Sequence, residues 1–170
     1  MWQIEDLIRA NGLDIDRIDD TIVKGFPEES RKQIHEWYES LIDMMRREDV
    51  AAKGHLQMNR NIIGALADLH RQIMADPDSD FDEYRREFYN TLPFIVELRA
   101  KSGDEKAGEI ETCFNALYAQ LLLRLQHKEI STETERAFKQ ISQFISLLAR
   151  DFALDEREEL FKNKDEDKQQ

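Results

Sequence analysis

The 170-residue sequence is poor in glycine, proline and cysteine, the residues on which β-rich and disulfide-bonded small folds depend. It contains 6 glycines and 3 prolines, too few for the frequent turns of an all-β domain, and no β-branched runs that alternate with polar residues. A single cysteine, Cys113, permits no disulfide within the chain and is typical of a reducing compartment. The longest run of leucines, Leu121–Leu123, is far too short to cross a membrane.

Basic residues are scarce relative to acids, since 24 Lys and Arg stand against 36 Asp and Glu and give a net charge of −12. Nucleic acids and anionic membrane surfaces are bound through basic patches, so we expect neither as a partner. The N-terminus shows no targeting segment, because acids appear by Glu5 and no basic region precedes an apolar stretch. These features predict a cytoplasmic protein.

Apolar residues at helical spacing are abundant. Hydrophobic residues make up 41% of the chain and charged residues 35%, which suits amphipathic helices with one wet face each. The segment 110–125 is apolar on two sides, with Leu121 on one face and Ala119 on the other. We therefore predict an all-α, single-domain bundle of about six to seven helices around a central buried helix at 110–127. Leu121→Ala should then cost about 2–5 kcal/mol.

The composition also predicts where the bundle ends. Residues 1–154 carry the helical pattern, whereas 155–170 hold 7 acids and 4 bases and read as an acidic, disordered tail. Leu160 and Phe161 are the only large apolar residues of this tail. Within the predicted helix at 80–100, Pro93 removes a backbone donor, so we expect a kink or a restart there.

No motif in the sequence names a reaction. None of the four histidines sits in an H-E-x-x-H motif, the Glu-x-x-His pairs of di-iron bundles do not occur, and no G-x-G-x-x-G loop is present. We therefore predict no catalytic residues, no metal ligands and no cofactor.

Three polar residues stand out on the helix predicted for 55–75. His55, Asn59 and His70 lie on or near the same face as the apolar Ile62 and Leu66. Buried polar groups need hydrogen-bond partners, so the plain interpretation is a satisfied network in the core or at an interface. The alternative interpretation is a pocket between helices that binds a small molecule or a metal ion.

Five blocks of the sequence together resemble an uncharacterised family of Bacteroidetes bacteria, domain of unknown function 4924. The blocks are MWQIEDLIRANG at 1–12, EWYESLIDMMR at 36–46, GHLQMNRNII at 54–63, LPFIVELRAK at 92–101 and ETCFNALYAQLLLRLQHKEIS at 111–131. The resemblance implies a helical, cytoplasmic bacterial protein with no assigned activity. It also implies a further N-terminal stretch before the Met-Trp-Gln block, without which the first helix lacks its opening turns.

The leading functional hypothesis is a non-enzymatic interaction or adaptor module with a protein partner or a homo-oligomeric state. The alternative is a small-molecule or metal binder that uses His55, Asn59 and His70. An enzyme of an unfamiliar type also stays open, because a fold does not fix a function. An exposed apolar patch would favour the first hypothesis, and a deep pocket with perturbed titratable groups would favour the others.

Overall fold

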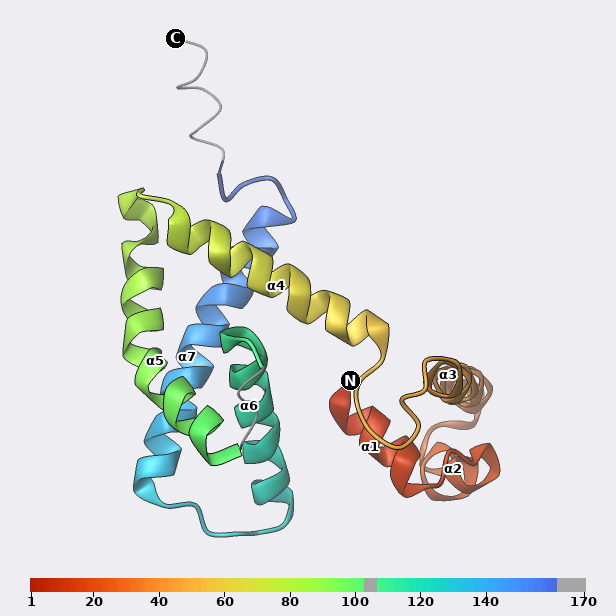
Figure 1. Ribbon diagram of the computed structural model, residues 1–170. Helices are drawn as coiled ribbons and strands as arrows, with labels where there is room; N and C mark the ends of the chain where they lie inside the picture. The colour runs from red at the N-terminus through yellow and green to blue at the C-terminus, as the bar shows by residue number, and fades with distance from the viewer. Residues whose placement is uncertain (103–106, 162–170) are drawn as a thin grey trace. The chain divides into compact units, whose positions relative to one another are not determined.

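The computed structural model describes residues 1–102 and 107–161 (Figure 1). Within these residues the chain forms seven α-helices and no strand, which confirms the all-α prediction. The chain divides into two compact units, residues 1–62 and 63–170. The sequence did not predict this division, because the boundary falls inside the continuous helix α4 (Gln57–Ala75), where no polar linker marks it.

Unit 1 is built from short helices and one long helix that follow one another along the chain. They are α1 (Trp2–Ala10), α2 (Ile15–Thr21), the 3₁₀ helix η1 (Val23–Gly25), α3 (Glu28–Arg47) and the beginning of α4. Gly12 adopts a φ of 70° after α1, a left-handed conformation that suits glycine. The Asp14 side chain then accepts the backbone N–H groups of Asp16 and Arg17 and begins α2. The core comprises Ile8, Ile18, Val23, Tyr38, Leu41, Ile42, Met45, Val50 and Leu56.

Unit 2 is organised around its last helix. After the rest of α4 it contains the 3₁₀ helix η2 (Ser79–Phe81), α5 (Asp82–Ser102), α6 (Glu109–Leu125) and α7 (Thr132–Asp155). The Ser131 side chain caps α7 by accepting the backbone N–H of Thr134. Helix α7 packs against both α5 and α6. Its buried face consists of Phe138, Ile141, Phe144, Leu148 and the carboxylate residue Asp151.

The prediction that the helix at 110–127 is a central helix covered on both faces is wrong for its second half. Ile110, Cys113 and Ala116 are buried in the first turns of α6. Further along, Leu121 is 38% exposed and Leu125 is 57% exposed. Periodicity shows that a helix has two apolar faces, but it does not show whether both are covered within the same chain.

Two further expectations concern Pro93 and the tail. Helix α5 continues through Pro93 as one helix, and Figure 1 shows its later part running in a different direction from its first part. Beyond α7, Leu160 and Phe161 pack against the core of unit 2, and the Phe161 ring lies 5.5 Å from that of Phe81. Contact with the core therefore extends past the predicted tail boundary at residue 155. The rest of the predicted tail, 162–170, lies outside the described residues.

A membrane-spanning helix would need a long, nearly uncharged apolar stretch. Among the described residues, no helix combines the length and the apolar character that crossing a membrane requires.

Candidate functional site

The carboxylate of Glu5 brings two of the predicted site residues together in unit 1. Glu5 is 1% exposed, and its Oε1 accepts hydrogen bonds from the Leu56 backbone N–H at 2.9 Å and from the Asn59 Nδ2 at 2.7 Å. Its Oε2 lies 2.6 Å from the Nδ1 of His55. Trp2 stacks on the His55 ring, with 4.5 Å between ring centroids.

This cluster joins α1 to the start of α4. The first backbone N–H groups of a helix have no partner inside the helix, and they favour negative charge nearby. The Glu5 carboxylate lies at that end of α4, and the Glu48 carboxylate accepts the Gln57 N–H there at 2.6 Å. Arg9 adds a bond to the Val50 carbonyl oxygen at 3.0 Å. The cluster thus holds the loop before α4 against α1.

Glu5 is the member of this cluster that the sequence analysis missed. A signal for it existed, because Glu5 lies three residues before Ile8 and shares the buried side of α1. An acid on the inward face of an amphipathic helix requires donors around it. His55, held through Nδ1 by a buried carboxylate, retains Nε2 for another partner, which is an arrangement also used to orient a general base.

His70 lies apart from His55 and Asn59, in the core of unit 2. Its Nδ1 is 2.8 Å from the Tyr84 hydroxyl, and its ring centroid is 4.6 Å from that of Phe88. Burial lowers the pKa of His70 below its ordinary value, although the charge of Glu109 acts in the opposite direction. Burial also raises the pKa of Tyr84, so the pair is neutral at neutral pH. Sequence reasoning grouped three residues that the structure divides between two units.

The lowered pKa of His70 makes the stability of unit 2 depend on pH. The unfolded chain protonates His70 near its ordinary pKa of 6.5, whereas the folded chain does so only at lower pH. The contribution of neutral His70 to the free energy of unfolding is therefore complete above pH 6.5. This contribution is lost as the pH falls through 6.5 toward the lowered pKa of the folded chain. In urea unfolding followed by circular dichroism, the wild type should lose more stability between about pH 7.5 and about pH 5.5 than His70→Gln does. Equal losses in both proteins would contradict this assignment.

Neither a thiol nucleophile nor a metal centre is apparent. Cys113 is buried, and burial raises the pKa of its thiol to about 12, although the charge of Arg99 acts in the other direction. A thiol with such a pKa is not ionised at neutral pH and is a poor nucleophile. In the part of the chain that the structure describes, no three His, Cys, Asp or Glu side chains are grouped so that they could hold a metal ion.

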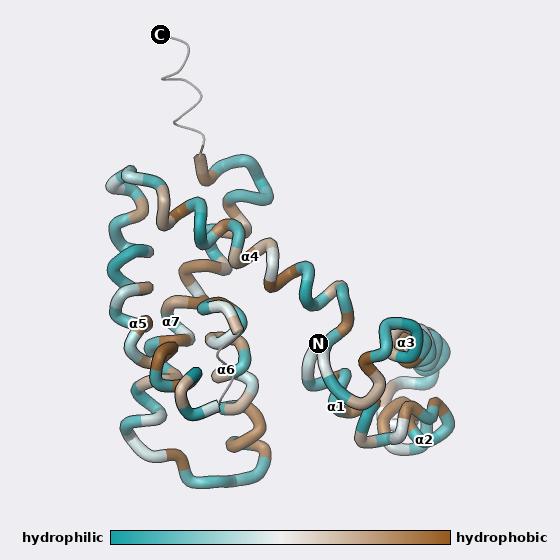
Figure 2. Tube along the Cα trace, in the orientation of Figure 1, coloured by the Kyte–Doolittle hydropathy of each residue, from teal (hydrophilic) through white to brown (hydrophobic). Residues whose placement is uncertain are grey.

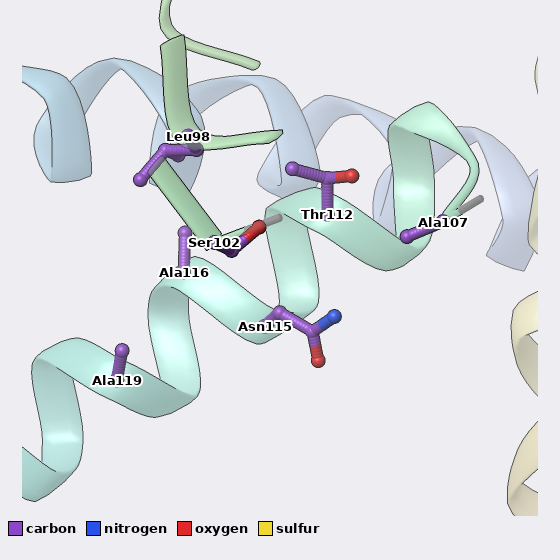
Figure 3. Close-up of a pocket in the computed structure, with 7 residues that line it drawn as sticks. All are labelled: Leu98, Ser102, Ala107, Thr112, Asn115, Ala116 and Ala119. Atoms are coloured by element: carbon purple, nitrogen blue, oxygen red, sulfur yellow. The ribbon is translucent and has the colours of Figure 1, made fainter. Parts of the chain in front are cut away.

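A small pocket lies between α5 and α6 (Figure 3). Its volume is about 250 Å³, and it is lined by Leu98, Ser102, Ala107, Thr112, Asn115, Ala116 and Ala119. The Thr112 hydroxyl is already engaged, since it donates to the Gly108 carbonyl at 2.8 Å and accepts from the Arg99 Nε at 3.1 Å. The Ser102 hydroxyl donates to the Arg99 carbonyl at 3.3 Å, so Asn115 is the polar side chain of the lining that we consider for a ligand. The pocket is smaller than most ligand sites, which enclose about 300–1,000 Å³.

The second half of α6 presents an apolar surface that the core does not use. Tyr118, Leu121, Leu122 and Leu125 follow the spacing i, i+3, i+4, i+7, and we call these four residues the outer face of α6. Leu121 and Leu125 are exposed, and Tyr118 and Leu122 are half-buried. One to two turns earlier on the same side of the helix, Phe114 packs against the core of unit 2, as do Leu117 and Leu123 on α6. Figure 2 shows hydrophobic colouring along this half of α6.

The chain was compared with protein families, curated proteins and solved structures. The model of a protein family described as a domain of unknown function, DUF4924, matches residues 1–159. No curated protein and no solved structure matches the chain.

Proposed function

The chain belongs to the DUF4924 family, and on that premise we propose that it is a non-enzymatic helical interaction module that binds a protein through the outer face of α6. The observation that carries the proposal is the exposure of Leu121 and Leu125 on the helix with the most apolar sequence of the chain. The proposal includes a cytoplasmic location. It also excludes nucleic acid as the partner, because the net charge is −12.

The outer face of α6 has the pattern of a helix that packs against another helix. Residues at i, i+3, i+4 and i+7 are the usual anchors when one amphipathic helix is bound by another surface. Burial of apolar surface stabilises a complex by roughly 25 cal/mol per Å² before the costs of association. Large contiguous apolar patches on monomers are uncommon and mark interaction sites. The exposed leucines of α6 add little to the core of unit 2, and they are better placed to bind a partner.

Purification of the tagged chain from its native cells under mild conditions tests this proposal. Leu121→Glu places a charge in the outer face of α6, and Val96→Glu is the matched control, because Val96 is 58% exposed on α5. We expect both variants to fold like the wild type, and only Leu121→Glu to lose a co-purifying protein or a second copy. A protein that stays bound to both variants would contradict the proposal.

The pocket between α5 and α6 supports a second candidate function, the binding of a small apolar molecule with one polar group. The three residues first predicted for this role do not form one pocket, since His70 lies in unit 2 and His55 and Asn59 lie in unit 1. Phenol is a suitable probe, because its ring fits an apolar lining and its hydroxyl could bond to Asn115. Phenol should shift the NMR amide signals around Thr112 in the wild type but not in Ala119→Leu, which narrows the pocket. Absence of shifts at millimolar phenol would remove this candidate.

A further inference from the structure

We infer that the partner of the outer face of α6 is a second copy of this chain, packed against it as an antiparallel helix pair about a two-fold axis. The inference rests on the proposed function and names the partner for the same surface. Closed two-fold dimers are the commonest oligomers, and they require a surface patch that is complementary to itself. The outer face of α6 meets this requirement in both spacing and charge.

The spacing of the four residues is symmetric about the middle of the face. A two-fold axis between Leu121 and Leu122 sets Leu121 opposite the partner's Leu122, and the same axis sets Tyr118 opposite the partner's Leu125. All four apolar side chains then have an apolar counterpart, without a shift in register. Antiparallel helices that pack with about 20° between their axes accommodate this kind of seam.

The charges along α6 favour the antiparallel orientation over the parallel one. The first turn of the helix carries the acids Glu109 and Glu111, whereas its last turn carries Arg124 and Lys128 follows shortly after it. With the axis between Leu121 and Leu122, the partner's Lys128 lies about one helical turn from Glu111 of the first copy, within reach of a long side chain, and the reverse pair forms at the other end. A parallel partner would instead place like charges side by side, which costs free energy.

The overall charge of the protein also points to this face. Two copies that each carry a net charge of −12 repel one another, so a stable contact needs a surface that is poor in acids. Residues 112–128 contain no Asp or Glu, and they include the whole outer face of α6. The four apolar residues can therefore be buried between two copies with no acid among them, and Glu111 lies only at the edge of the contact.

Sedimentation equilibrium of the full chain tests the inference directly. At about 100 μM we expect the wild type and Val96→Glu to be dimeric, and Leu121→Glu to dissociate with a Kd raised at least about tenfold. The orientation is tested by charge reversal at Glu111, in the first turn of α6, and at Lys128, which follows the end of α6 and lies too far from Glu111 within one copy to interact. Glu111→Lys and Lys128→Glu should each weaken the dimer, and the double variant should restore it.

Each other outcome overturns the inference. A wild type that stays monomeric at about 100 μM would contradict the inference. A dimer that Leu121→Glu leaves intact would also contradict it. Failure of the inference differs from failure of the proposed function. Suppose that the wild type is monomeric but binds a different protein, and that Leu121→Glu loses this protein. That result would reject a second copy as the partner and would keep α6 as the interaction surface.

Discussion

Glu5→Ala should destabilise unit 1 by about 3–5 kcal/mol, as expected when one member of a buried charged network is removed. The substitution leaves the Leu56 N–H and the Asn59 amide without their acceptor, and it leaves the Nδ1 of His55 without its partner. Each buried donor without an acceptor costs about 1–3 kcal/mol. Loss of the carboxylate also removes a favourable negative charge from the N-terminal end of α4.

Tryptophan fluorescence during urea unfolding measures this effect in the full chain. The two tryptophans, Trp2 and Trp37, both lie in unit 1, so their signal reports this unit and not the other. The matched control is Glu48→Ala, because Glu48 also accepts an N–H at the start of α4, but in exposed surroundings. We expect the control to cost less than about 1 kcal/mol. Equal costs for Glu5→Ala and Glu48→Ala would contradict the role given to Glu5.

Phe144→Ala should destabilise unit 2 by about 3–5 kcal/mol, the usual cost of truncating a fully buried aromatic side chain. Phe144 is fully buried on α7, and its ring centroid lies 5.4 Å from that of Tyr84 and 5.5 Å from that of Phe88. The cavity left behind would border His70, whose ring also contacts Phe144. The loss of stability therefore has two sources. Apolar surface is no longer buried, and the neighbouring side chains can fill the cavity only in part.

Leu121→Ala is the matched comparison for this second prediction. The sequence alone assigned it a cost of about 2–5 kcal/mol, on the view that α6 is the central helix. The structure reduces that expectation to less than about 1 kcal/mol, because Leu121 is exposed and lies outside the core. Urea unfolding followed by circular dichroism compares the two variants. A larger cost for Leu121→Ala than for Phe144→Ala would restore α6 as the buried centre.

The helices were predictable because their apolar residues recur at helical spacing and their ends carry local signals, such as Asp14 before α2. The position of α6 in the fold was not predictable in the same way. An apolar face that meets the core and one that points to solvent have the same pattern along the chain. The division into two units could not be predicted from the sequence either, because α4 passes through the boundary without a break in its helical pattern.

The candidate site was predicted in part. The structure brings His55, just before α4, and Asn59, in the first turn of α4, to the same carboxylate. Their shared partner, Glu5, lies about fifty positions earlier in the chain, and no local spacing connects residues that are so distant. His70 follows the same helical spacing on α4, yet it is surrounded by the aromatic rings of unit 2. A shared helix face therefore does not ensure a shared site when the helix crosses a boundary between units.

The rate of thiol labelling at a cysteine introduced in place of Leu121 tests the central claim, that the second half of α6 faces outward to bind a partner. The native Cys113 is buried with a raised pKa, so the wild type should stay unlabelled and serve as the blank. In dilute solution, Leu121→Cys should react nearly as fast as a cysteine in an unfolded chain, and Ile141→Cys on the buried face of α7 should not react. Protection of Leu121→Cys equal to that of Ile141→Cys in the dilute monomer would contradict the account.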